Sequence, residues 1–164
     1  MHIGLMPQDC GVSKPAQLGA LRPTGTQPIE ITGTVWDGDG APVKDVLIEV
    51  WQADEQGQTT TDGHAYWQRV ASDFETGKWQ INTVKPGTIG NAAPHLTLWI
   101  VARGVNIGLH TRLYFPDDAL DAVLQSLPVD RRATLLAQQD GNNPARYTFN
   151  IHLQGDKETV FFDV

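Results

Sequence analysis

The alternation of apolar and polar residues is clearest between positions 84 and 115. Two apolar stretches, 94–103 and 109–115, flank a Gly- and Asn-containing segment at 104–108, a composition typical of a hairpin turn. Because the side chains of a strand alternate between its two faces, one face of the first strand carries His95, Thr97, Trp99, Val101 and Arg103. The other face carries Leu96, Leu98, Ile100 and Ala102, and the pattern predicts that this second face is buried.

The same two-residue period recurs along most of the chain. It predicts further strands over 28–36, 43–53, 66–74, 78–84, 146–154 and 159–162. Turn-forming sequences separate these strands, such as DGDG at 37–40, the polar stretch 54–63 and ETG at 75–77. At least seven short strands joined by turns favour an all-β fold, a β-sandwich.

One segment has a helical period instead. Between positions 117 and 139, Asp117 can cap a helix whose apolar residues follow at helical spacing, Leu120, Val123, Leu124 and Leu127. Pro128 ends that helix, and Asp130 can cap a second short helix that includes Leu135 and Leu136. The sequence therefore predicts a short helical insert at the edge of the sandwich.

The N-terminal region differs from the rest of the chain. Residues 1–27 carry Gly, Pro, Gln and Ser and show no sustained period, so we expect an irregular arm. Residues 28–164 form the expected β-sandwich domain. A chain of 164 residues is long enough for one domain with a sizeable core.

Composition excludes several classes of protein. The net charge of −7 and the pI near 5.0 argue against a nucleic-acid partner and against an anionic membrane surface. No apolar run is long enough to span a bilayer, and no secretory signal is visible. Cys10 is the only cysteine, which excludes an intrachain disulfide. These features predict a cytoplasmic protein.

The residues show no self-contained active site. The histidines are His2, His64, His95, His110 and His152, and none pairs with another at the spacing of a local metal motif. A three-dimensional cluster of His95, His110 and His152 stays open, although isolated, hydrogen-bonded histidines are the favoured interpretation. No serine lies in a nucleophile elbow, and the glycines mark turns rather than a phosphate-binding loop.

Arg103 is the most informative single residue. At the end of an apolar strand, beside a Gly-containing turn, its guanidinium can present a fixed fork to a carboxylate. On the residues alone, a solvated arginine or a structural ion pair is the favoured interpretation. The five tryptophans could form a sugar platform, but their strand positions indicate core or interface packing.

Four stretches are together typical of one enzyme family: DGDGAPVKDVLIEVWQADEQG, SDFETGKWQINTVKPG, APHLTLWIVARGVNIGLHTRLYF and QGDKETVFFDV. With them the chain resembles the intradiol ring-cleavage dioxygenases over residues 29–164. The segments ARGVNI, LHTRLYF and ETVFFD narrow the resemblance to the alpha subunits of members that act on protocatechuate. HIGL at 2–5 also matches those subunits.

The resemblance implies a β-sandwich whose catalytic relatives hold Fe(III) with two tyrosines and two histidines. Phenolate oxygens are hard, anionic donors that stabilise ferric iron. In this sequence the tyrosine positions are Thr59 and Ile89, and the two histidine positions are His95 and Thr97. Because His95 alone is retained, the resemblance implies that this chain binds no catalytic metal and supplies no catalytic residue.

The resemblance further implies a partner, a beta subunit of the same fold that carries the Fe(III). The two subunits would form a hetero-oligomer, with the small aromatic substrate, protocatechuate, bound near their interface. Arg103 matches an alpha-subunit arginine in the wall of that pocket and is the expected substrate-binding residue. The family's segment before HIGL does not appear in this sequence, so we expect either that the start codon is placed too late or that the arm over 1–27 is shortened.

One alternative from another class stays open at this point. A stand-alone β-sandwich binding module, transthyretin-like or sugar-binding, would need no iron-bearing partner. A self-sufficient enzyme with a different metal at the three histidines His95, His110 and His152 is disfavoured by their spacing.

Overall fold

A computed structural model of the chain describes residues 17–21 (backbone only), 27–60 and 65–163. The strands of this part are β1 (Gln17–Leu21), β2 (Pro28–Trp36), β3 (Leu47–Gln52), β4 (Tyr66–Ala71), β5 (Lys78–Val84), β6 (His95–Val101), β7 (Leu109–Tyr114), β8 (Gln138–Asp140), β9 (Asn143–Thr148) and β10 (Ile151–His152). Its helices are α1 (Ala122–Ser126) and α2 (Val129–Ala133). Within the described ranges, no helix is long and apolar enough to cross a membrane.

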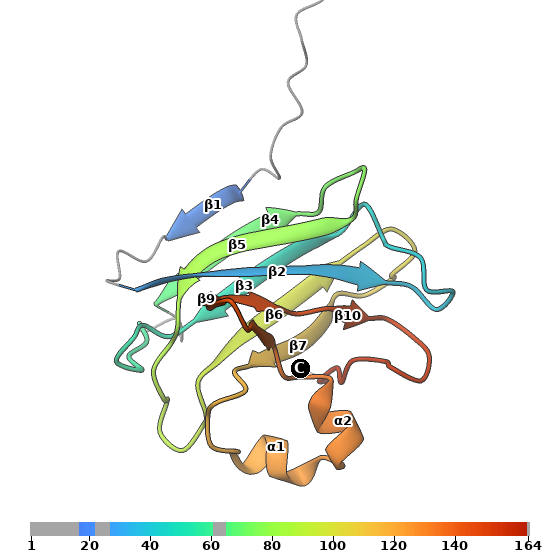
Figure 1. Cartoon of the computed structure of the whole chain (residues 1–164). Helices are drawn as coiled ribbons and strands as arrows, with labels where there is room; N and C mark the ends of the chain where they lie inside the picture. Colours follow the sequence, from blue (N-terminus) through green and yellow to red (C-terminus); the bar gives the residue numbers. More distant parts are fainter. Residues whose placement is uncertain (1–16, 22–26, 61–64, 164) are drawn as a thin grey trace, which may run out of the picture.

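The strands form two layers. Sheet A has the strand order β1-β4-β3-β6-β7. Sheet B has the order β10-β2-β9-β8, where β9 and β10 pair with successive stretches of β2, and β5 also pairs with β2. Figure 1 shows sheet B in front of sheet A, with the two helices together at one end of the layers. The β-sandwich predicted from the strand period is confirmed.

The core lies between the sheets, because each strand turns its apolar side inward. In β6 the burial alternates as predicted: Leu96, Leu98 and Ile100 are buried, whereas the residues of the other face are half-buried. In β2 the buried set includes Ile31 and Val35. The largest fully buried side chains of this core include Trp79, Phe115 and Phe149.

The predicted strand over 146–154 is wrong in its middle, where residues 149 and 150 interrupt it. β9 and β10 both run parallel to β2, and the break between them lets Phe149 N–H donate to the carbonyl of Thr32 at 2.8 Å. The side-chain oxygen of Asn150 then accepts from Thr34 N–H at 3.0 Å. A side chain thus replaces a carbonyl in the ladder, so β2 stays paired across the break.

Two other predictions about strands need correction. The stretch 159–162 is not a regular strand and makes a single bridge, between Phe162 and His110 of β7. The arm 1–27 was expected to be irregular, but its residues 17–21 form β1, which pairs antiparallel with β4 at the edge of sheet A. The remainder of residues 1–26, with HIGL and Cys10, lies outside the described residues, as does His64.

The helical insert is present but is capped differently from the prediction. Asp121, rather than Asp117, is the N-cap of α1, and its Oδ1 accepts from Leu124 N–H at 2.9 Å. α2 begins after Pro128, so Asp130 lies in its first turn instead of capping it. Both helices are shorter than the apolar spacing suggested.

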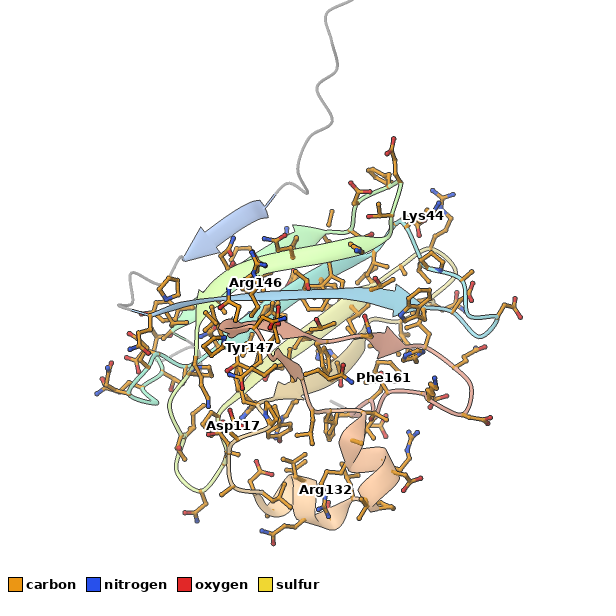
Figure 2. All side chains as sticks on the ribbon, in the orientation of Figure 1. Lys44, Asp117, Arg132, Arg146, Tyr147 and Phe161 are labelled. Atoms are coloured by element: carbon orange, nitrogen blue, oxygen red, sulfur yellow. The ribbon has the colours of Figure 1, made fainter. Side chains whose placement is uncertain are left out.

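The insert has a small core of its own against sheet A. Leu124 and Leu135 are buried with Tyr114, the last residue of β7. Arg132 of α2 donates to the carbonyls of Leu124 and Leu127 at the end of α1, at 2.8 and 3.2 Å, and Figure 2 shows it at the two helices. The insert is therefore fixed to the end of β7, beside the first residue of β6.

Candidate functional site on the outer face of sheet A

The outer faces of the two sheets differ in chemistry. On sheet B this face is mostly polar, with Glu30 paired to Arg146 at 3.2 Å, and its half-buried Trp36 stacks on His152. On sheet A it carries the half-buried side chains Trp51, Trp67 and Trp99, and Trp51 and Trp67 are direct cross-strand partners. Such an aromatic face is typical of a surface that packs against another protein.

Two of the four family ligand positions lie on this face, in β6. Thr97 is flanked in register by Trp51 of β3 and by Arg112 of β7, and His95 lies opposite Tyr114. The rings of His95 and Tyr114 are 5.3 Å apart. The predicted placement of His95 and Thr97 on one face is confirmed.

The other two positions lie on loops that pack against each other. Thr59 follows the turn after β3, and Ile89 follows the Lys-Pro-Gly segment after β5; both are exposed. Gly87 N–H donates to the carbonyl of Asp54 at 2.7 Å. A Cβ at Gly57 would lie 2.0 Å from the carbonyl oxygen of Thr88, so the two loops interlock through backbone atoms.

Hydrogen bonds fix the surroundings of His95. Its Nδ1 lies 2.8 Å from the carbonyl oxygen of Ala93, and Ala93 N–H donates to Oδ2 of Asp121 at 3.1 Å. Asp121 therefore ties the segment before β6 to α1. On the other side, Arg112 donates to the Tyr114 hydroxyl at 3.2 Å and stacks over the ring of Phe162. The side chains around His95 are held by one another.

This environment shifts the pKa values of two groups. Burial lowers the pKa of the His95 imidazole, the nearby Arg112 guanidinium lowers it further, and the bond to the Ala93 carbonyl opposes the shift. Burial raises the pKa of the Tyr114 phenol, and Arg112 opposes that rise. Both groups are thus held in their neutral forms.

The lowered pKa of His95 makes the stability of the chain depend on pH. The unfolded chain takes up the proton near pH 6.5, before the folded chain does. The contribution of His95 is therefore complete above about pH 6.5 and is lost as pH falls through the lower folded-state pKa. We expect the free energy of unfolding to decrease over this window, and to decrease less in His95→Asn.

Denaturant titrations at a series of pH values check this expectation. His152→Asn is the matched comparison, since burial and then the nearby Lys157 lower the pKa of His152 as well. The two variants together should remove the contribution of these two histidines to the decrease that begins as pH falls below about 6.5. An unchanged slope in His95→Asn would contradict the assignment.

The four family ligand positions do not fit a ferric ion. Ile89 has no donor atom in its side chain, and Thr59 and Thr97 offer neutral hydroxyls where the chemistry needs phenolate or imidazole. His95 is the one retained donor. Among the described residues, no group of three or more His, Cys, Asp or Glu side chains is placed to hold a metal ion. The three-histidine cluster does not form either, because His152 lies in sheet B, stacked on Trp36, whereas His95 and His110 lie in sheet A.

Arg103 lies just beyond β6, at the end of sheet A opposite the helical insert. Its side chain is 88% exposed, and its Nε lies 3.0 Å from Oδ2 of Asp45. Both residues line an open depression of about 820 Å³ at this end of the sandwich, whose floor includes Val105 and Leu109. The favoured interpretation from the residues, a structural ion pair, is therefore found here, and the exposure leaves the guanidinium accessible as well.

Sequence reasoning missed two residues of this region, Asp45 and Arg112. Their positions follow from the pairing of β3, β6 and β7, which local sequence does not contain. Leu47 pairs with Val101, and beyond this pair the bend with Asp45 meets the turn with Arg103 at 3.0 Å. In the same way Thr97 pairs with Arg112.

Comparisons with known proteins agree with this geometry. A family model described as "Dioxygenase" matches residues 12–94. The chain is 40% identical to the protocatechuate 3,4-dioxygenase alpha chain of Pseudomonas putida, over 82% of this chain and 75% of the relative. It is 35% identical to the alpha chain of Burkholderia cepacia, over 98% and 91%, and 30% identical to the beta chain of the same organism, over 80% and 66%.

Solved structures show the same architecture. The dioxygenase domain of a dioxygenase–carbohydrate-binding protein fusion from Streptomyces sp. SirexAA-E superposes with a TM-score of 0.63 at 24% identity, over 84% of this chain and 83% of that one. These comparisons support the dioxygenase interpretation and not the alternative of a stand-alone binding module. The chain belongs to the intradiol ring-cleavage dioxygenases, and within them it groups with the alpha chains.

Proposed function

We propose that this chain is the non-iron-binding alpha subunit of a protocatechuate 3,4-dioxygenase. The family uses iron, and in this proposal the Fe(III) belongs to a beta subunit of the same fold. Together the subunits would use O2 to open the ring of 3,4-dihydroxybenzoate between its two hydroxyl-bearing carbons. Both oxygen atoms enter the product, 3-carboxy-cis,cis-muconate.

The set of family ligand positions carries this proposal. The fold and the loop contacts around these positions persist, yet Thr59, Ile89 and Thr97 leave His95 as the one family donor. His95 itself is held by the Ala93 carbonyl at 2.8 Å and by the Tyr114 ring at 5.3 Å, contacts that need no metal. A chain built this way serves an enzyme as a structural and substrate-binding subunit.

The outer face of sheet A supports a partner. Three half-buried tryptophans lie there, whereas the outer face of sheet B carries one, Trp36, among polar residues. A beta chain among the relatives provides a partner of the same fold. Arg103 lies at the end of this face, in the turn that follows β6, two residues after the last outward side chain of that strand. We propose that Arg103 reaches the substrate site formed with the partner and binds the carboxylate of protocatechuate.

Iron content tests the proposal. The chain expressed alone should contain no stoichiometric iron and show no tyrosinate-to-iron absorbance in the visible range. Co-expressed with its beta-subunit candidate, the complex should be red-brown and active on protocatechuate. Stoichiometric iron and colour in the lone chain would show that the ligand positions have been assigned wrongly, and an active partner that does not bind this chain would refute the subunit role.

A further inference from the structure

The ion pair of Arg103 has a defined origin in the sheet. Along β3 and β6 the outer-face partners are Trp51 with Thr97, Glu49 with Trp99 and Leu47 with Val101. The same register carried two residues further places Asp45 opposite Arg103, and their side chains meet at 3.0 Å. Arg103 lies in the turn after β6 and Asp45 in the bend before β3, so the contact joins the two segments that continue this strand pair.

The atoms involved matter for binding. Asp45 contacts Arg103 through Nε, at the base of the guanidinium. The two terminal nitrogens lie beyond Nε, on a side chain that is 88% exposed. Those nitrogens form the edge that binds a carboxylate through two parallel hydrogen bonds. The exposure keeps this edge accessible to a ligand.

A free arginine side chain loses rotamer freedom when it binds a ligand, and this loss weakens binding. Arg103 is 88% exposed, so little of the protein restrains it apart from Asp45, whose own side chain is only 29% exposed. Because the Asp45 carboxylate contacts Nε, it limits the directions in which the Arg103 guanidinium can point. Asp45 therefore lowers the entropic cost of binding. Its negative charge acts in the opposite direction, because it weakens the attraction of Arg103 for a carboxylate.

We infer that Asp45 is a positioning residue for Arg103 and, through it, a determinant of specificity for carboxylate-bearing catechols. The inference rests on the proposed function, in which Arg103 binds the substrate carboxylate. The two effects of Asp45 have opposite signs. If Asp45 mainly orients Arg103, replacing Asp45 raises KM. If Asp45 mainly neutralises the charge of Arg103, replacing it lowers KM.

The experiment uses the complete alpha–beta complex with protocatechuate and catechol as substrates. In Asp45→Ala, KM for protocatechuate should rise about two- to fivefold, the range that exposed ion pairs support. kcat and the KM for catechol should stay near their original values. Asp45→Asn keeps an oxygen beside Nε and should restore most of the affinity. Asp39→Asn removes a charge from the same loop without touching Arg103, and serves as the matched control.

The Arg103→Ala variant separates the positioning role of Asp45 from the binding of the substrate carboxylate by Arg103. If Arg103→Ala loses selectivity for protocatechuate and Asp45→Ala does not, the positioning role is wrong while the proposed function stands. A lower KM in Asp45→Ala would also overturn the inference, because charge neutralisation would then dominate. If Arg103→Ala changes neither substrate selectively, the proposed binding of the substrate carboxylate by Arg103 fails. In the double variant, Asp45→Ala should have no further effect.

Discussion

Replacing Arg103 with alanine should raise KM for protocatechuate roughly 10- to 100-fold in the complex, the cost of a lost hydrogen-bonded contact between two charged groups. KM for catechol, which has no carboxylate, should change little. The side chain is 88% exposed and ends the outer face of sheet A, so its removal leaves the core intact. Steady-state kinetics on both substrates measure this selectivity directly.

Arg146→Ala is a close control for this variant. Arg146 also makes a surface ion pair through Nε, to Glu30, but on the polar outer face of sheet B, where Figure 2 labels it. It should leave both KM values unchanged. Equal losses on the two substrates in Arg103→Ala would indicate a change in assembly and would count against a carboxylate contact.

Gly33→Ala should destabilise the fold more than any surface change discussed above. Gly33 lies on the inward side of β2, and a Cβ there would lie 1.9 Å from the carbonyl oxygen of Phe149 and 2.9 Å from the ring of Trp79. Phe149 is part of the break between β9 and β10, so backbone would have to move. We expect a loss of about 3 kcal/mol in the free energy of unfolding.

Thermal unfolding of the full-length chain checks this value. A loss of that size corresponds to a decrease of about 10 °C in Tm for a chain of this length. Gly141→Ala is the control, because a Cβ at Gly141 meets no atom within 4 Å. Similar Tm values for Gly33→Ala and Gly141→Ala would mean that β2 and the break can separate without cost.

Much of the fold could be predicted because its strands have one buried and one outer face. The period of two located β2, β5, β6 and β7 with small errors at their ends. It failed at Phe149 and Asn150, where the apolar pattern continues but a side-chain oxygen takes over from the backbone. It also failed at Asp117, since a residue four positions later, Asp121, meets both Leu124 and Ala93.

The site was predictable only in part, for a physical reason. A strand's alternation places His95, Thr97 and Arg103 on one face, but it says nothing about which strand lies beside them. Asp45 and Arg112 become neighbours of these residues through the register of β3, β6 and β7. Long-range pairing of this kind is not written in local sequence, so the partners of the predicted residues emerged from the structure.

The interlocked loops after β3 and β5 have a consequence for the cell. Backbone contacts from Asp54 to Gly87 and from Gly57 to Thr88 hold these loops together, where a catalytic relative would add bonds from both loops to a metal. Under the proposed function, maturation of this subunit is independent of the iron supply. During iron starvation it should accumulate in folded form and await its partner, so the holoenzyme would be limited by metallation of the beta subunit alone.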